Sequence, residues 1–106
     1  MSATKSVLST VYFKSQVTAT VNGVYPYNPT SDVVEAAFVA PGTNPAAPDW
    51  KLGSWETKGT SYFARALVGP GPGAVIDLPV GTYRMWVRVT DNPEIPVLEA
   101  GNVRVV

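Results

Sequence analysis

Apolar and polar side chains alternate along the second half of the chain, and this alternation predicts β-strands that are buried on one face. The clearest case is residues 82–90. Its apolar positions are Tyr83, Met85, Val87 and Val89, and the positions between them are Arg84, Trp86, Arg88 and Thr90. Because successive side chains of a strand point to opposite faces, we expect the first set in the core and the second set outside. A second such run, residues 97–106, follows a short proline-containing turn.

The turns and the other apolar runs predict an all-β chain. Prolines and glycines separate most of the apolar runs, as tight turns between strands require. After an N-terminal strand or arm at about residues 6–14, we expect strands at residues 16–22, 33–39, 50–57, 61–68, 74–78, 82–90 and 97–106. Gly101 predicts a bulge in the last strand. The sequence from Pro79 to Tyr83 is typical of a tyrosine corner, in which the phenol hydroxyl bonds to backbone upstream.

Residues 32–40 are the one segment in which a helix competes with a strand. Ser31 or Asp32 could begin a helix, and Glu35 would then complete a capping box. The short length of the segment and its valines favour a buried strand instead.

The pair of runs that closes the chain is typical of immunoglobulin-like and fibronectin-III-like sandwiches, so we expect an all-β sandwich of that type with about seven strands. A chain of 106 residues forms one domain. The sandwich would take residues 16–106, with Trp50 or Trp55 as its core tryptophan. Residues 1–15 would be an arm that pairs with a neighbour, or an extra edge strand within the chain. Both interpretations stay open.

Three connections are expected at one end of the sandwich if the strands simply alternate in direction: residues 40–49, 69–73 and 91–96. They hold seven of the ten prolines, among them Pro45, Pro70 and Pro93. Proline lowers the entropy that a loop loses when it is immobilised, so this end is suited to docking on a partner. The prolines could equally serve to blunt the strand ends against edge pairing.

The amino-acid composition limits which kinds of partner the protein could bind. Charged residues make up 15% of the chain, against about 25% in average proteins, and such a surface is expected where neighbours cover it. Eight acidic and eight basic side chains cancel without a basic stripe, so we expect no nucleic-acid partner. No apolar run is long enough to span a membrane, and residues 1–6 do not begin a signal peptide; we expect a protein made and folded in a cytoplasm.

The residue types that most catalytic sites need are missing. The chain has no histidine and no cysteine, which removes the usual nucleophile–base pairs and ordinary zinc sites. The carboxylates are scattered over different strands and loops. Asp91, Asn92 and Glu94 share one loop, but turn chemistry explains them better than calcium binding does. We therefore expect no enzymatic activity, no cofactor, no metal and no small-molecule substrate.

Aromatic residues provide the candidate interface. Trp86 stands between Arg84 and Arg88 on the outward side of its strand, where the guanidinium groups could flank or stack on the indole. Trp and Arg dominate binding hot spots, so these three residues are interface candidates. Alternatively, an N-terminal strand of the same chain covers Trp86. The further candidates lie in loops or in the N-terminal segment: Tyr25, Tyr27, Pro45, Pro70, Pro93, Val11 and Phe13.

Several phrases of the sequence carry a family resemblance. They are VNGVYPYNPTSDVVE at 21–35, GSWE at 53–56, YFARALVG at 62–69, and LPVGTY at 78–83 continuing through DNP at 91–93. With them, residues 17–106 resemble the small immunoglobulin-like structural proteins of tailed bacteriophages, particularly those that infect actinobacteria. The resemblance implies a virion component without enzymatic activity on the capsid, at the head–tail joint or in the tail. The first sixteen residues lie outside it.

The leading functional hypothesis is a head-associated virion protein, a capsid decoration or minor capsid protein. It would bind the shell, other virion proteins or copies of itself, and it would be located in the virion after assembly in the host cytoplasm. A head–tail connector or a tail component is one alternative. The other is a carbohydrate-binding adhesion module with a stacking platform of Tyr25, Tyr27, Trp50 and Trp86.

Overall fold

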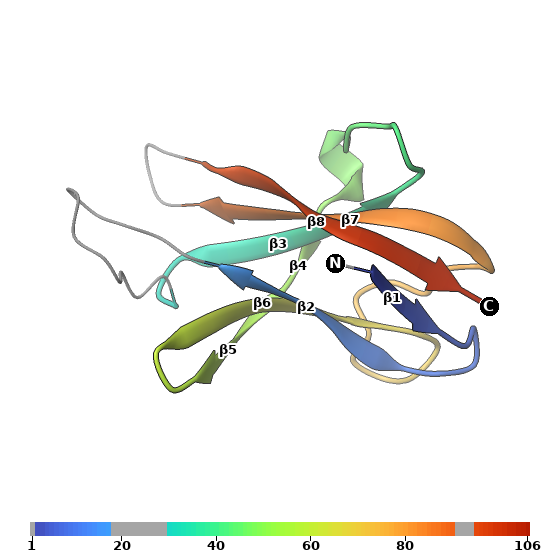
Figure 1. Cartoon of the computed structure of the whole chain (residues 1–106), viewed down its shortest axis with the longest axis horizontal. Coiled ribbons are helices and arrows are strands. Elements are labelled where there is room, and N and C mark those ends of the chain that lie inside the picture. Colours follow the sequence, from blue (N-terminus) through green and yellow to red (C-terminus); the bar gives the residue numbers. More distant parts are fainter. Residues whose placement is uncertain (1, 18–29, 91–94) are drawn as a thin grey trace.

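Two β-sheets pack face to face in the computed structural model, which describes residues 2–17, 30–90 and 95–106 (Figure 1). One sheet has five strands in the order β1-β8-β7-β3-β4, and the other has three in the order β2-β6-β5. The strands are β1 Ser2–Lys5, β2 Val11–Val17, β3 Val33–Val39, β4 Lys51–Leu52, β5 Ser54–Lys58, β6 Ser61–Val68, β7 Gly81–Thr90 and β8 Val97–Val105. A three-residue 3₁₀ helix, η1 (Ala47–Asp49), precedes β4. The all-β sandwich is thus confirmed, with eight strands in the described residues instead of about seven.

Two predicted strands, 33–39 and 61–68, have the observed bounds, and those at 82–90 and 97–106 differ from β7 and β8 by one residue. The expected strand at 50–57 is divided at Gly53 into β4 and β5, which belong to different sheets. At this crossing the Gly53 N–H donates to the carbonyl of Val34 at 2.8 Å. A Cβ on Gly53 would lie 2.9 Å from the backbone oxygen of Arg65, so glycine is needed where the chain passes between the sheets.

The helical alternative for residues 32–40 is wrong, because Val33–Val39 form strand β3. The inward side chains of β3, such as Ala36 and Phe38, belong to the core between the sheets. Ala37 and Val39, on its outer side, are also buried. A strand covered on both sides has a continuous apolar sequence, and this is why periodicity alone could not separate it from a helix.

The prediction of a strand at 74–78 is wrong, and this error changes the expected direction of the strands that follow. Residues 69–80 connect β6 to β7 without crossing the sandwich, and they form a single parallel bridge, between Val68 and Ile76. With one crossing fewer, β7 runs opposite to the expected direction: Val39 pairs with Arg84, and Val33 with Thr90.

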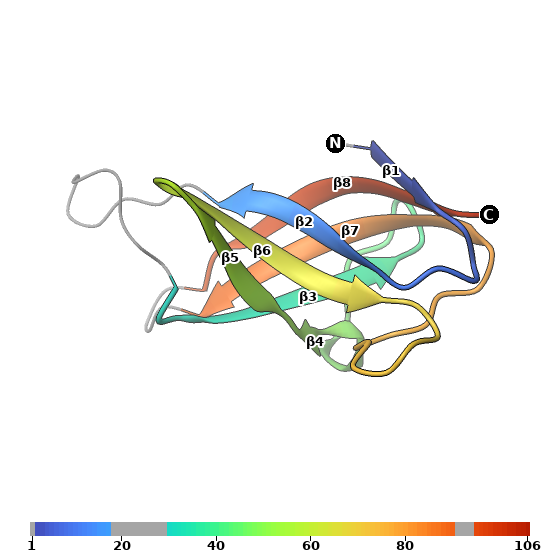
Figure 2. The same cartoon turned by 90° about the horizontal axis from the view of Figure 1, so that it is seen from below.

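Connections 40–50 and 69–80 therefore share one end, while the β7–β8 connection starts at the other (Figures 1 and 2). Of the seven prolines expected at a single end, Pro96 does not belong there, because it lies in the β7–β8 connection at the opposite end. Pro93 lies outside the described residues.

The N-terminal segment forms two strands that pair within the chain. β1 pairs in parallel with β8, and β2 pairs antiparallel with β6. β2 includes the first two residues of the expected strand at 16–22 and begins earlier, at Val11. Residues 18–22 lie outside the described part. The crossing between the sheets is held by buried Lys5, whose Nζ donates to the carbonyls of Ser6 at 2.8 Å and Ser9 at 2.9 Å.

The core confirms the predicted sides of β7, with Met85, Val87 and Val89 buried between the sheets. Trp55 packs against this core and donates from Nε1 to the carbonyl of Asp32 at 2.9 Å, so it is the core tryptophan. Two turn predictions also hold. The Tyr83 hydroxyl donates to the carbonyl of Pro79 at 2.8 Å, as a tyrosine corner requires.

The bulge in β8 is the second of these turn predictions. Gly101 has a φ of 133°, and the register between β7 and β8 shifts between Met85 and Trp86. Within the described ranges, no helix has the length and hydropathy for crossing a membrane.

Candidate functional site

The outer side of the five-stranded sheet carries the predicted group Arg84, Trp86 and Arg88. Cross-strand pairing places Trp86 between Ala37 of β3 and Glu99 of β8, and places Arg88 beside Glu35. We use the name Trp86 face for the surface formed by Glu35, Trp50, Arg84, Trp86, Arg88 and Glu99. Strand register brings together the five residues of β3, β7 and β8. Trp50, the residue before β4, joins them through its contact with Arg88.

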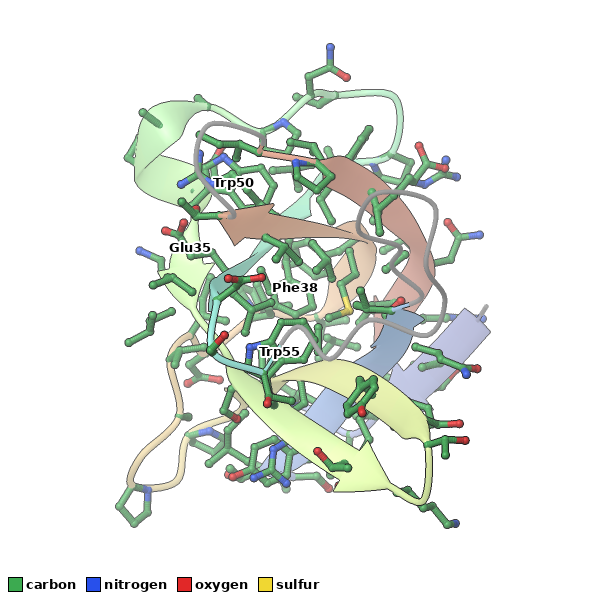
Figure 3. The ribbon with its side chains drawn as sticks, turned by 90° about the vertical axis from the view of Figure 1, so that its left-hand side faces the viewer. Glu35, Phe38, Trp50 and Trp55 are labelled. Carbon is green, nitrogen blue, oxygen red and sulfur yellow. The ribbon has the colours of Figure 1, made fainter. Side chains whose placement is uncertain are left out.

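Arg88 is held on two sides. Its Nε and one terminal nitrogen donate to Glu35 Oε1 at 3.1 and 2.9 Å. Its guanidinium carbon also lies 4.4 Å from the centre of the Trp50 ring, within the range of a cation–π interaction. Figure 3 shows Glu35 and Trp50 close together at the side of the five-stranded sheet, and Phe38 and Trp55 between the sheets.

Arg84 is also fixed by its own chain. It donates to Asn102 Oδ1 through Nε at 3.2 Å and through a terminal nitrogen at 3.0 Å, and it forms an ion pair with Glu99. Each arginine is thus engaged by a carboxylate from a neighbouring strand, and the ring that Arg88 covers is Trp50 instead of Trp86. Two arginines and two glutamates leave the Trp86 face without net charge.

Trp86 itself is half-buried, and its cross-strand partner Ala37 is fully buried. The indole Nε1 is shielded from solvent and has no acceptor within residues 2–17, 30–90 and 95–106. A shielded donor without an acceptor costs about 1–3 kcal/mol relative to a satisfied one. Trp86 therefore does not contribute the hydrogen bond that Trp55 makes, and its N–H adds nothing to the stability of the fold.

Exposed aliphatic side chains border the ion pair of Arg88 and Glu35. Val97 pairs with Arg88, and Leu52 pairs with Glu35 on the other side. Val33, two residues before Glu35 in β3, lies at the same end of the sheet. Leu52 is 66% exposed, and Val33 and Val97 are about half exposed. This combination of a central tryptophan, ordered arginines and apolar side chains at the margin is the composition of a protein–protein contact.

The other predicted interface residues that the structure describes do not join this face. Pro45 and Pro70 lie in the connections 40–50 and 69–80, and Pro70 is exposed. Phe13 is 4% exposed and belongs to the core, and Val11 packs against the same core, so both serve the sandwich itself. The other three predicted residues, Tyr25, Tyr27 and Pro93, lie outside the described residues.

Sequence reasoning missed Glu35, Leu52 and Glu99 as members or neighbours of the site. Each lies beside β7 or β3 only because of strand register, which alternation along a single strand does not reveal. Trp50 was recognised as a possible sugar platform, but its contact with Arg88 was not expected.

A hollow of about 230 Å³ lies near the crossing at Gly53. Its polar side chains include Arg65 and Ser54, and Arg65 Nε donates to Ser54 Oγ at 3.0 Å. The lining is otherwise mostly apolar and includes no carboxylate. In the part of the chain that the structure describes, no three acidic side chains come together as metal ligands.

Comparisons of the chain with family models, with curated proteins and with solved structures found no match.

Proposed function

We propose that this chain is a non-enzymatic, immunoglobulin-like structural protein of a tailed-bacteriophage virion, associated with the head as a decoration or minor capsid protein. It docks on the shell, on other virion proteins or on copies of itself through the Trp86 face. The observation that carries the docking role is Trp86: a half-buried indole, with no acceptor for its N–H in the described residues, among arginines that are already ordered.

The strand order supports the immunoglobulin-like type. In that fold a sheet of strands B, E and D faces a sheet that contains G, F and C, with a further strand beside C in variable-type domains. The order β2-β6-β5 corresponds to the first sheet, and β8-β7-β3-β4 to the second. The corner at Tyr83 falls at the start of β7, the strand that corresponds to F. Fully buried Met85, two residues later, takes the position of the second conserved cysteine.

The physical state of the Trp86 face supports docking on a protein. Binding energy is lost when flexible side chains become ordered, and here Arg84 and Arg88 are held in advance by Glu99 and Glu35. The absence of net charge on the face gives no attraction for a polyanion. Exposed Val33, Leu52 and Val97 offer apolar area beside the indole. The assignment to a virion is supported by the family resemblance and by the low charge content.

The experiment is quantitative mass spectrometry of purified particles of the phage that encodes the chain. We expect a copy number that matches the symmetry of the shell; a number that matches the neck or tail would favour the connector or tail alternative. Absence from the particles would contradict a virion role.

A matched pair of variants tests the docking face in the same particles. Trp86→Ala should lower the copy number about tenfold or more, as expected for a hot-spot residue. Leu8→Ala removes an apolar side chain that is 84% exposed in the connection between β1 and β2, and it should leave the copy number unchanged. Equal incorporation of both variants would reject the Trp86 face.

The carbohydrate-binding alternative gains no specific support. One ring face of Trp50 is occupied by Arg88, and the tyrosines of the expected platform lie outside the described residues. Sugar stacking needs an accessible ring face.

A further inference from the structure

We propose that the free edge of β2 accepts an extended segment of a protein partner in which apolar and acidic side chains alternate. This second contact surface belongs to the three-stranded sheet. It does not depend on the Trp86 face, which lies on the outer side of the other sheet.

Among the described strands, β2 has a neighbour on one side only. β2 pairs with β6 over its full length, from Val11 opposite Val68 to Val17 opposite Tyr62, without a shift in register. No described strand pairs with its other side. In an antiparallel ladder every second residue directs its N–H and C=O away from the neighbour, so β2 presents a row of unpaired groups.

The devices that usually protect an edge strand are missing from β2. It has seven residues, whereas the other edge strands β5, β1 and β4 have five, four and two. It contains no proline and no bulge. Its single lysine, Lys14, reaches across β6 and donates to both carboxylate oxygens of Glu56 on β5, at 3.0 and 2.8 Å. Lys14 therefore leans toward the middle of the sheet and leaves the edge open.

The two sides of β2 determine which side chains a partner strand needs. Val11, Phe13 and Val17 point inward and join the core, so the inward side chains of an added strand must be apolar. The outer side of this sheet carries Lys14, Lys58 and Arg65 against one carboxylate, Glu56, which gives an excess of two positive charges. Acidic outward side chains on the added strand complement that excess.

Charge also decides against a second copy of the chain as the occupant. If two β2 strands paired antiparallel about their centres, Lys14 would lie opposite Lys14 of the other copy. A shift by two residues avoids this pair but still brings two positively charged surfaces together. Like charges across a strand pair are destabilising.

The test uses the full chain, labelled with ¹⁵N, and two heptapeptides of alternating sequence, one of valine and glutamate and one of valine and lysine. We expect the glutamate peptide to bind, to slow hydrogen exchange at alternate backbone amides of β2 and to shift their resonances. The lysine peptide should bind at least about tenfold more weakly, because like charges oppose it.

Charge variants distinguish binding at the edge of β2 from a general attraction of the acidic peptide to the positive sheet surface. Lys14→Glu should weaken the glutamate peptide about tenfold, while the same change at Lys58, on the far edge of the sheet, should have a smaller effect. Lys14→Gln, which adds no charge, keeps the test valid if Lys14→Glu does not fold; it should weaken binding to an intermediate degree. Trp86→Ala should bind the peptide as the unchanged chain does, so failure of the proposed docking face would not be confused with failure here.

Three results would overturn the inference: equal binding of the two peptides, resonance shifts away from β2, or a chain that dimerises by itself with β2 amides protected. The last result would identify a second copy as the occupant.

Discussion

The two sides of β7 carry different kinds of side chain: apolar ones on the inner side, and arginines and a tryptophan on the outer side. The inward side chains of Met85, Val87 and Val89 fill the core between the sheets. The outward side chains of Arg84 and Arg88 are held in ion pairs with carboxylates of the neighbouring strands. One strand therefore carries both a packing surface and an ordered polar surface, and stability and binding should respond separately to changes on its two sides.

The two tryptophans show the same contrast. Trp55 packs against the core and its N–H has an acceptor, the carbonyl of Asp32. Trp86 lies on the outer side with a shielded N–H that has no acceptor in residues 2–17, 30–90 or 95–106. A buried polar group without a partner calls for an explanation. The proposed docking at the Trp86 face is the explanation that the proposed function offers for it.

The largest effect is expected from Met85→Ala on the inner side. Met85 is 0% exposed, and the variant should lower the free energy of unfolding by about 3 kcal/mol because it removes buried contacts and leaves a cavity. Urea denaturation followed by tryptophan fluorescence measures the loss. A loss below about 1 kcal/mol would mean that the inner side of β7 is not the packing surface described here.

A smaller effect is expected from Tyr83→Phe, at the start of the same strand. The variant keeps the ring and removes only the hydroxyl that donates to the Pro79 carbonyl at 2.8 Å. The loss in unfolding free energy should be about 1 kcal/mol, the usual net value of one hydrogen bond. An unchanged denaturation midpoint, at an unchanged slope, would show that the corner does not stabilise the fold.

Local alternation was sufficient to predict much of this contrast. It located β6 and β7 and assigned Met85 and Trp86 to opposite sides, because the period of a strand is a property of a short segment. The location of β3 came instead from the short length of its segment and from its valines. Turn chemistry predicted the corner at Tyr83 and the bulge at Gly101 for the same reason.

The rest depends on contacts between distant segments. The crossing at Gly53 is set by close approach to the backbone of Arg65, which nothing in residues 50–57 reveals. Residues 74–78 look like a strand but make one bridge, and this error reversed the expected end of the β7–β8 connection. Glu35 and Glu99 join the candidate site through register, a relation between strands.

Trp86→Phe should change the stability of the isolated chain by less than about 0.5 kcal/mol. The variant keeps an aromatic ring beside Ala37 and removes an N–H that has no acceptor among the described residues, so no hydrogen bond is lost. Trp55→Phe is the matched control, since it removes an N–H bonded at 2.9 Å and should cost about 1 kcal/mol. Equal losses for the two variants would remove the distinction between the inner and outer tryptophan.

The smallest effect on stability is expected from the ion pair of Lys14 and Glu56, on the outer side of the three-stranded sheet. We expect this exposed pair to contribute much less to stability than buried Met85 does. The hydrogen bond from Lys14 holds the pKa of the Glu56 carboxyl below its usual value near 4.5, and the charge of Arg65 acts in the same direction. Because the pKa is lower in the folded chain, the stabilisation is present above the unfolded value and is lost as pH falls through the folded value. Carboxyl resonances followed by NMR should give a pKa for Glu56 below 4.5, and Lys14→Gln should raise it.

If Lys14→Gln left this pKa unchanged, Lys14 would not be held by Glu56 in solution. The lysine would then be free to protect the edge of β2.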